Sequence, residues 1–313
     1  MPLLRQVKTN IIFLINFFFT LLCLFGYFFI KVLSPIILIR FGALRNEIIG
    51  NSFFDLEYYL SYKKKYNKKK TIDFFFPATN TYANTFFEKI ARRHVNISFY
   101  YRHMFNIINF LKDEKHLIKT KHGSRDVIGL FQSSQTNFYF TDEENNIGNQ
   151  FLNKHFGTKK KYVCVLVRDD SYKKKFQSHL NTDWSYHSYR NSNVYNFEKS
   201  IKYLIENDYG VIRMGKIAEK QLSINNNAFI DYPFIKSKSD FLDIWLMANC
   251  NFCVTTGTGL DDVCLTFRKP IVEVSYLPLG FIRCNQAFTV TIFKKLRDKN
   301  TKRYLSVSNQ IDN

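Results

Sequence analysis

Residues Asn251–Gly280 read NFCVTTGTGLDDVCLTFRKPIVEVSYLPLG, and this stretch decides the fold class. Phe252–Thr255 is a short apolar and β-branched run that suits a buried parallel strand. The turn TTGTG follows at once, and the apolar stretch from Asp261 to Phe267 predicts a helix. Arg268-Lys269-Pro270 breaks that helix before Ile271–Ser275, which predicts the next strand. The unit is therefore strand, glycine turn, helix, strand.

A turn of this kind suits a phosphate or diphosphate. Glycines allow the backbone to approach a ligand closely, and the first amides of a helix face outward with the positive end of its dipole. The residues expected to offer amides and hydroxyls are Thr255, Thr256, Gly257, Thr258 and Gly259. Asp261 either accepts hydroxyls of a ribose or sugar or complements the helix dipole. The alternative is that the turn has only a structural role, because a G-x-G sequence alone is a weak signal of phosphate binding.

Strands alternate with helices elsewhere in the chain, which predicts an α/β fold with parallel sheets. Near the N-terminus, Ile36–Arg40 predicts a strand, Phe41–Leu44 a glycine turn and Arg45–Tyr59 a helix. Tyr162–Val167 is a strongly β-type run that predicts the first strand of a second domain. Ligands bind at the carboxyl ends of such strands, so the residues that follow Val167 are candidates for a site.

The stretch from Asn10 to Leu33 is almost wholly apolar, and Ile11–Ile30 is long enough to cross a bilayer as a helix. We expect an uncleaved membrane helix or a deeply inserted monotopic one, since no small-x-small cleavage site follows it. Positive residues are more numerous after this segment than before it, which favours a cytoplasmic catalytic region on the inner (cytoplasmic) membrane. We therefore predict a membrane anchor over 1–34, an N-terminal domain over 35–145 and a C-terminal domain over 146–313.

The chain has 313 residues and a formal net charge of +19, which raises the question of an anionic partner. Its lysines lie in short blocks in expected loops, and no zinc-finger, helix-turn-helix or RNP-type pattern is visible, so we expect an anionic membrane surface and no nucleic acid. The six cysteines show no metal-ligand grouping and read as small buried residues. The acidic residues near the strand ends are the adjacent pairs Asp169-Asp170 and Asp261-Asp262, whose side chains point in different directions, so we expect no metal and no cofactor.

Several short segments of the sequence resemble those of a known family: YVCVLVRD at 162–169, DWSYHSYRNS at 183–192, RMGK at 213–216, SDFLD at 239–243, and the stretch 255–270. Together they resemble a family of bacterial glycosyltransferases found among surface-polysaccharide genes. The resemblance implies two Rossmann-like domains facing a central cleft, a GT-B-like arrangement. It also implies a nucleotide-sugar donor, bound by the C-terminal domain, and a saccharide or lipid-linked saccharide acceptor on the side of the N-terminal domain.

Sugar transfer without a metal needs cationic groups that stabilise the leaving diphosphate. Arg168 and Arg213 each follow a strand and are the first candidates for donor binding, with Lys216 as a third. His187 is a candidate general base and Asp169 its rival. Tyr186 and Arg190 lie in the same polar loop as His187 and are candidates for acceptor contact.

Two features keep alternatives open. Leu166 stands where related enzymes often carry a histidine, and relatives are expected to continue through further helices beyond Asn313. The alternatives are transfer of another phosphate-activated group and a catalytically inactive or truncated, membrane-tethered nucleotide-binding or scaffold protein.

Overall fold

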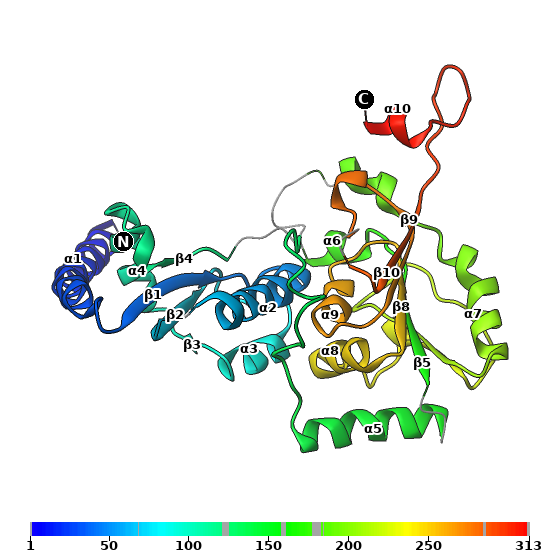
Figure 1. Cartoon of the computed structure of the whole chain (residues 1–313), viewed down its shortest axis with the longest axis horizontal. Helices are drawn as coiled ribbons and strands as arrows, with labels where there is room; N and C mark the ends of the chain where they lie inside the picture. The colour runs from blue at the N-terminus through cyan, green and yellow to red at the C-terminus, as the bar shows by residue number, and fades with distance from the viewer. Residues whose placement is uncertain are drawn as a thin grey trace. The chain divides into compact units, whose positions relative to one another are not determined.

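The computed structural model describes residues 2–67, 69–120, 125–157, 161–176, 183, 185–283 and 286–311; the side chains of 2–16, 186, 187, 281 and 311 lie outside this description. The chain divides by its contacts into two units. Unit 1 holds Met1–Ile48 and Tyr62–Lys121, and unit 2 holds Ile49–Ser61 and His122–Asn313. The domain boundaries expected from the sequence stay predictions. Figure 1 shows the elements of each unit.

Unit 1 is built on a four-stranded sheet of order β3-β2-β1-β4, in which every pair is parallel. Its strands are β1 (Leu38–Leu44), β2 (Thr71–Pro77), β3 (Asn96–Ile97) and β4 (Leu117–Ile118). Its helices are α1 (Pro2–Leu33), α3 (Thr85–Arg92), α4 (Tyr101–Phe110) and the short η1 (Glu114–His116), while α2 (Ile49–Tyr66) contributes to both units. The predicted α/β class with parallel strands is confirmed for this unit.

Gly42 corrects one expectation. The sequence predicts a glycine turn over 41–44, whereas these residues continue strand β1. A Cβ on Gly42 would lie 2.9 Å from the Cβ of Ile118 and 3.1 Å from the ring of Phe75. Glycine is needed here because side chains of the neighbouring strands lie close to the backbone. The sequence predicted a turn because glycine is also common in turns.

Helix α1 packs on unit 1 through its C-terminal half, where Ile30 joins Phe41 and Ile108 in a buried cluster. Among the described residues, no helix combines the length and apolar character needed to cross a membrane. The spanning helix predicted over Ile11–Ile30 is therefore not found in that part of the chain, and the side chains of 11–16 lie outside the description.

Unit 2 contains a six-stranded sheet of order β10-β9-β8-β5-β6-β7, again with every pair parallel. The strands are β5 (Tyr162–Leu166), β6 (Gly210–Arg213), β7 (Phe229–Asp231), β8 (Phe252–Thr255), β9 (Ile271–Tyr276) and β10 (Thr289–Phe293). The helices are α5 (Asp142–Phe156), α6 (Ser171–Phe176), α7 (Glu198–Glu206), α8 (Asp240–Asn249), α9 (Asp261–Thr266) and α10 (Val307–Ile311). Short 3-10 turns are η3 (Ser185–Arg190), η4 (Val194–Phe197), η5 (Tyr232–Phe234) and η6 (Leu279–Phe281). Figure 1 shows α7 on one side of the central strands and α8 and α9 on the other.

The core of unit 2 lies on the faces of β5, β6 and β8. Val163, Val165 and Val211 pack with Ile201 of α7, and each is at most 2% exposed. Cys164, Cys250, Cys253 and Cys264 are fully buried free thiols, which agrees with their interpretation as small core residues. Ser239 caps α8 as predicted, since its hydroxyl accepts from the Leu242 amide at 3.2 Å.

Helices α5 and α8 approach each other at Gly148. A Cβ at this position would lie 2.2 Å from the indole of Trp245, whose Nε1 donates to Asn145 Oδ1 at 3.1 Å. The indole is rigid and held by that hydrogen bond, so the contact leaves no room for a side chain.

We expect Gly148→Ala to lower the free energy of unfolding by about 1–3 kcal/mol, because overpacking outweighs the gain in helix propensity. Urea denaturation measures the change. Gly280→Ala is the matched control, since a Cβ there meets nothing within 4 Å. Equal stability of the two variants would contradict the close packing of α5 on α8.

Candidate functional site

The strand order of unit 2 places a site between β5 and β8. The chain runs from β5 outward to β6 and β7, then crosses back to β8, so the direction of strand progression reverses between β5 and β8. Their carboxyl ends are level, because Leu166 pairs with Thr255. In open parallel sheets ligands bind outside the carboxyl ends at such a reversal. Arg168 and the TTGTG turn both lie there.

The TTGTG turn is held by hydrogen bonds within the fold. The Thr256 amide donates to Leu166 O at 3.1 Å and the Gly257 amide to Thr255 Oγ1 at 3.0 Å, while the Thr258 amide donates to Asp261 Oδ2 at 2.9 Å. Gly257 has φ +83°, a conformation that favours glycine. The sequence predicted that these amides face a diphosphate, but three of them are already engaged. In the turn, the hydroxyl oxygen of Thr258 is buried and has no hydrogen-bond partner among the described residues.

A buried ionic network lies beneath the turn. Arg283 donates to Asp261 at 3.0 Å and to Asp262 at 2.7 Å, and its Nη1 lies 3.2 Å from Glu273 Oε1. Asp261 and Glu273 are fully buried, and burial raises the pKa of Glu273 while Arg283 opposes the rise. Burial by itself would lower the pKa of Arg283, yet the carboxylates hold it well above its ordinary value. Asp261 therefore orders the turn, and its oxygens are engaged by Arg283, Thr255 and Thr258 rather than by a sugar.

Three cationic side chains gather in front of the turn: Arg168, Lys173 and Arg190. Arg190 donates to Gly257 O at 3.1 Å, and Arg168 Nη1 lies 3.5 Å from the same oxygen. The buried Nε groups of both arginines have no hydrogen-bond partner in the part of the chain that the structure describes. Burial and the charge of Arg190 lower the pKa of Arg168. Burial, together with Arg168 and Arg190, lowers the pKa of Lys173 to about 8, against the pull of Asp170.

Arg168, Lys173 and Arg190 are therefore like charges that lie close together. Such crowding disfavours the charged forms, and a bound anion relieves it. The backbone fixes the arrangement: the Arg168 amide donates to Thr256 Oγ1 at 2.9 Å, and the Ser192 amide donates to Arg168 O at 3.1 Å. Arg168, Lys173 and Arg190, here called the cation cluster, form a candidate anion site.

The other candidates at these strand ends have partners of their own. Asp169 accepts from the amide and hydroxyl of Ser171 through Oδ1, at 3.0 and 2.7 Å, and from the Glu219 amide through Oδ2 at 2.9 Å. Its carboxylate therefore holds two loops together. The side chains of Tyr186 and His187 lie outside the described residues.

Arg213 and Lys216 are likewise engaged. Arg213 is 2% exposed and donates through Nη1 to Lys220 O at 2.6 Å and to Asp231 at 3.2 Å. Lys216 pairs with Asp240 at 3.2 Å. A buried arginine tied to a buried carboxylate serves the fold, because separating the pair would leave a charge without compensation. Arg213 and Lys216 are therefore not part of the candidate anion site.

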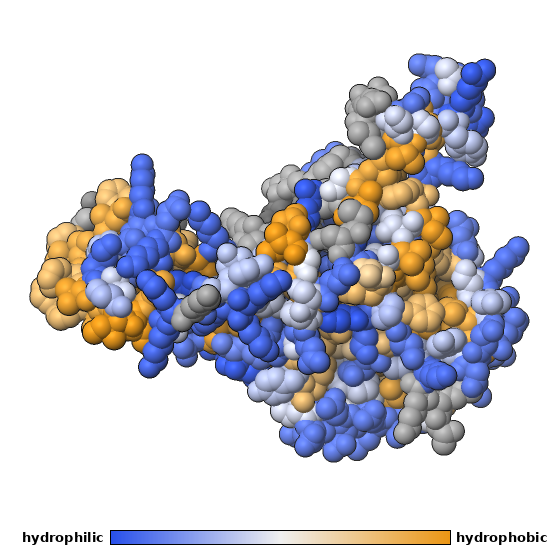
Figure 2. All heavy atoms as spheres, in the orientation of Figure 1, coloured by the Kyte–Doolittle hydropathy of each residue, from blue (hydrophilic) through white to orange (hydrophobic). Residues whose placement is uncertain are grey.

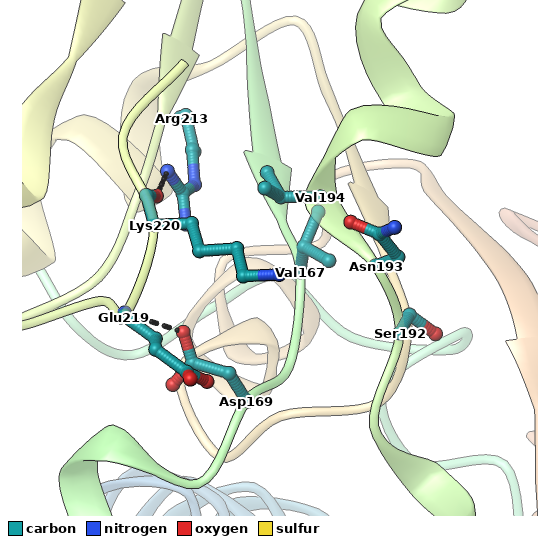
Figure 3. Close-up of a pocket in the computed structure, with 8 residues that line it drawn as sticks. All are labelled: Val167, Asp169, Ser192, Asn193, Val194, Arg213, Glu219 and Lys220. Atoms are coloured by element: carbon teal, nitrogen blue, oxygen red, sulfur yellow. Dashed lines mark hydrogen bonds between the residues drawn. The ribbon is translucent and has the colours of Figure 1, made fainter.

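A cavity of about 220 Å³ lies at the carboxyl ends of β5 and β6. Its lining residues are Val167, Asp169, Ser192, Asn193, Val194, Arg213, Glu219 and Lys220. Figure 3 shows Val167 and Val194 on one wall and the Glu219 backbone bonded to Asp169 on another. Val167 and Asp169 flank Arg168 in sequence, so the cavity and the cluster share one segment of chain.

Sequence reasoning missed two of these features. Lys173 belongs to the block Lys173–Lys175, which composition alone assigns to solvent; its place in the first turn after the strand end is the signal that distinguishes it. Arg283 lies just after the stretch Asn251–Gly280 and outside its motifs, and no local pattern reveals that it neutralises Asp261 and Asp262.

At the level of sequence, no protein-family model and no curated protein matches this chain. Solved structures do match it. The ADP-heptose LPS heptosyltransferase II of E. coli is 11% identical, with a TM-score of 0.50 over 81% of this chain and 90% of that one. A glycosyl transferase of family 9 from Veillonella parvula is 10% identical, with a TM-score of 0.50 over 84% of this chain and 89% of that one.

The chain has the fold of these sugar transferases. At this level of identity the likeness establishes the fold and leaves the activity to be argued from the site. The α/β fold with parallel sheets, predicted from the alternation of strands and helices, is thereby confirmed.

We expect Arg283→Met to lower the free energy of unfolding by about 3–5 kcal/mol at pH 8, because three buried carboxylates lose their counter-charge. The loss should be smaller at pH 5, because burial raises the pKa of Glu273 and protonation then removes part of its charge. Urea denaturation at both pH values measures it, with the exposed Arg303→Met as the control. A loss equal to that of the control would show that the network does not hold the turn.

Proposed function

We propose that this protein is a glycosyltransferase that takes a sugar from a nucleotide-sugar donor, with the donor diphosphate bound at the cation cluster. The observation that carries the proposal is the presence, at the strand-order reversal of a parallel sheet, of two partly buried arginines whose Nε groups have no hydrogen-bond partner among the described residues. Guanidinium groups bind phosphate oxygens in a planar fork, and Lys173 adds a third charge.

The cluster also suits the chemistry of transfer. Breaking the bond between sugar and diphosphate places negative charge on the leaving group, and preorganised cations lower the barrier by stabilising that charge. The TTGTG turn contributes shape and the Thr258 hydroxyl, because its amides at 256–258 are engaged within the fold. We propose that the chain's own cations do this work without a metal.

The cavity at the carboxyl ends of β5 and β6 suits the nucleoside of the donor. Val167 and Val194 offer apolar walls for a base, while Asn193 and Glu219 offer polar groups for ribose or base edges. Because the cavity is lined by the two chain neighbours of Arg168, we propose that one donor molecule occupies both sites. The neighbour from E. coli is named for ADP-heptose, so ADP-sugars are the first donors to test.

We propose a saccharide or lipid-linked saccharide acceptor in surface-polysaccharide synthesis, at the cytoplasmic face of the inner membrane. His187 stays the proposed general base, since both oxygens of Asp169 already accept hydrogen bonds. The alternative is a nucleotide-binding protein without turnover, which shares the anion site and lacks the transfer step.

We expect nucleoside diphosphates to bind the purified protein, and Arg168→Met and Lys173→Met each to weaken the binding at least roughly tenfold, the value of a charge-assisted hydrogen bond. Isothermal titration with ADP, UDP and GDP measures this. Lys174→Met is the matched control, because Lys174 is the exposed neighbour of Lys173. Equal affinity of all three variants would remove the cluster as the donor site.

Turnover is tested separately with labelled nucleotide-sugars, in buffer with and without a chelator. If the native protein releases or transfers the sugar and the Arg168→Met variant does not, the result supports the glycosyltransferase proposal. Nucleotide binding without any turnover across donors supports the inactive alternative. Turnover abolished by the chelator would contradict the metal-independent mechanism.

The affinity for a nucleoside diphosphate should fall as pH rises through about 8, the pKa of Lys173 in the free protein. The bound anion favours the protonated amine, so affinity is full below this pKa and declines by up to roughly tenfold per pH unit above it. The phosphate itself is already ionised, with a second pKa of about 6. Titration between pH 7 and 9.5 should show the decline in the native protein and a flatter profile in Lys173→Met. An identical decline in both would assign the titration to another group.

A further inference from the structure

Helix α1 has an inner and an outer face, and the inner face is firmly packed. Cys23, Gly26, Tyr27 and Ile30 recur at helical spacing and are the least exposed residues between 17 and 33. Ile30 and Tyr27 pack in the cluster that contains Phe41 and Ile108. This face belongs to the fold of unit 1.

Close contacts with α4 hold the part of α1 whose side chains the structure describes. Phe19 stacks on Tyr100 with ring centroids 6.4 Å apart, and a Cβ on Gly26 would lie 3.0 Å from Met104. Beyond α4, Asp113 accepts from Tyr27 Oη at 2.7 Å and from Lys31 Nζ at 2.9 Å. The contacts advance together along both helices, so α1 and α4 run side by side in the same direction.

The outer face of α1 is apolar and exposed. Phe25 is 70% exposed and Phe28 64%. Other exposed apolar residues of this face are Phe17, Phe18, Leu21, Leu22, Phe29 and Val32. Figure 2 shows the hydrophobic colour gathered over α1. Single exposed apolar residues are ordinary, but a continuous face of large ones marks an interaction surface.

The chemistry of this face fits lipid. A protein interface carries a polar rim with hydrogen-bonding groups, whereas the described outer face of α1 offers Thr20 and then only apolar side chains up to Lys31. Lysines gather where the helix ends: Lys31, Lys112, Lys115 and Lys119 outnumber Asp113 and Glu114, and Lys115 donates to Ser34 at 3.1 Å. An apolar helix face bordered by lysines is the pattern of a helix that lies in an anionic membrane surface.

We propose that α1 lies along the surface of an anionic bilayer with the Phe25 and Phe28 face inserted, while its Tyr27 and Ile30 face stays packed on α4. A helix that crossed the bilayer would have to leave the contacts with Met104 and Asp113. The inference concerns unit 1 and is independent of the donor site in unit 2.

The experiment is co-flotation of the full chain with vesicles of phosphatidylcholine alone or mixed with phosphatidylglycerol. We expect binding that is stronger to the anionic vesicles and weakened at least roughly tenfold in the double variant Phe25→Ser/Phe28→Ser. Tyr203→Ser is the matched control, because Tyr203 is 65% exposed on α7 of unit 2. Nucleotide binding, measured in parallel, should be equal in all three proteins.

The depth and orientation are read from Phe25→Trp, compared with Tyr203→Trp, using lipids brominated at shallow or deep positions. Quenching of the added indole by the shallow positions supports a helix in the interface. Quenching mainly by the deepest positions would overturn the proposal in favour of a crossing helix. Absence of vesicle binding, or a concentration-dependent dimer that Phe25→Ser/Phe28→Ser dissolves, would overturn it in favour of a protein-covered face.

Discussion

The charge balance around Arg283 is the constraint on which the donor side of this structure depends. Three carboxylates, Asp261, Asp262 and Glu273, lie buried beneath the turn between β8 and α9, and Arg283 is the cation that contacts all three. Because Asp261 is held there, its second oxygen can accept from Thr255 and Thr258 and so order the turn. The turn is therefore a product of buried electrostatics as much as of its glycines.

That internal ordering determines how an anion can be bound. Amides that serve the turn are not available to a ligand, and Gly257 instead presents its carbonyl oxygen to the two arginines. A neutral carbonyl oxygen does not cancel the charge of the two guanidinium groups beside it at the strand-order reversal. The site works by side-chain charge, in contrast to glycine loops that bind phosphate through the backbone.

In unit 1 the constraint is different: the apolar residues of α1 are more than the core of the unit buries. The inner face of α1 packs into the core of unit 1 through Ile30 and Tyr27. The large aromatic side chains on the opposite face are not buried in this core and stay exposed. The same helix thus serves both the packing of a domain and an exposed apolar face. Composition cannot separate the two roles, because both faces read as apolar in the sequence.

The sequence by itself determined the local elements of this protein. Phe252–Thr255 is the strand that the pattern predicts, Ser239 caps its helix, and the alternation of strands and helices predicts the parallel sheets. These features follow from side-chain periodicity and capping, which depend on residues a few positions apart. Arg168 was also foreseeable, since a strand end is a local feature. Only the tertiary structure decided which charged side chains face the site. Arg213 pairs with the buried Asp231, and Asp169 accepts from the amide of Glu219 in a neighbouring loop. Lys173 and Arg190 lie close to Arg168. Those outcomes depend on charges that meet across the fold from distant positions, and the energy of a charge depends on its burial and partners rather than on its neighbours in the chain.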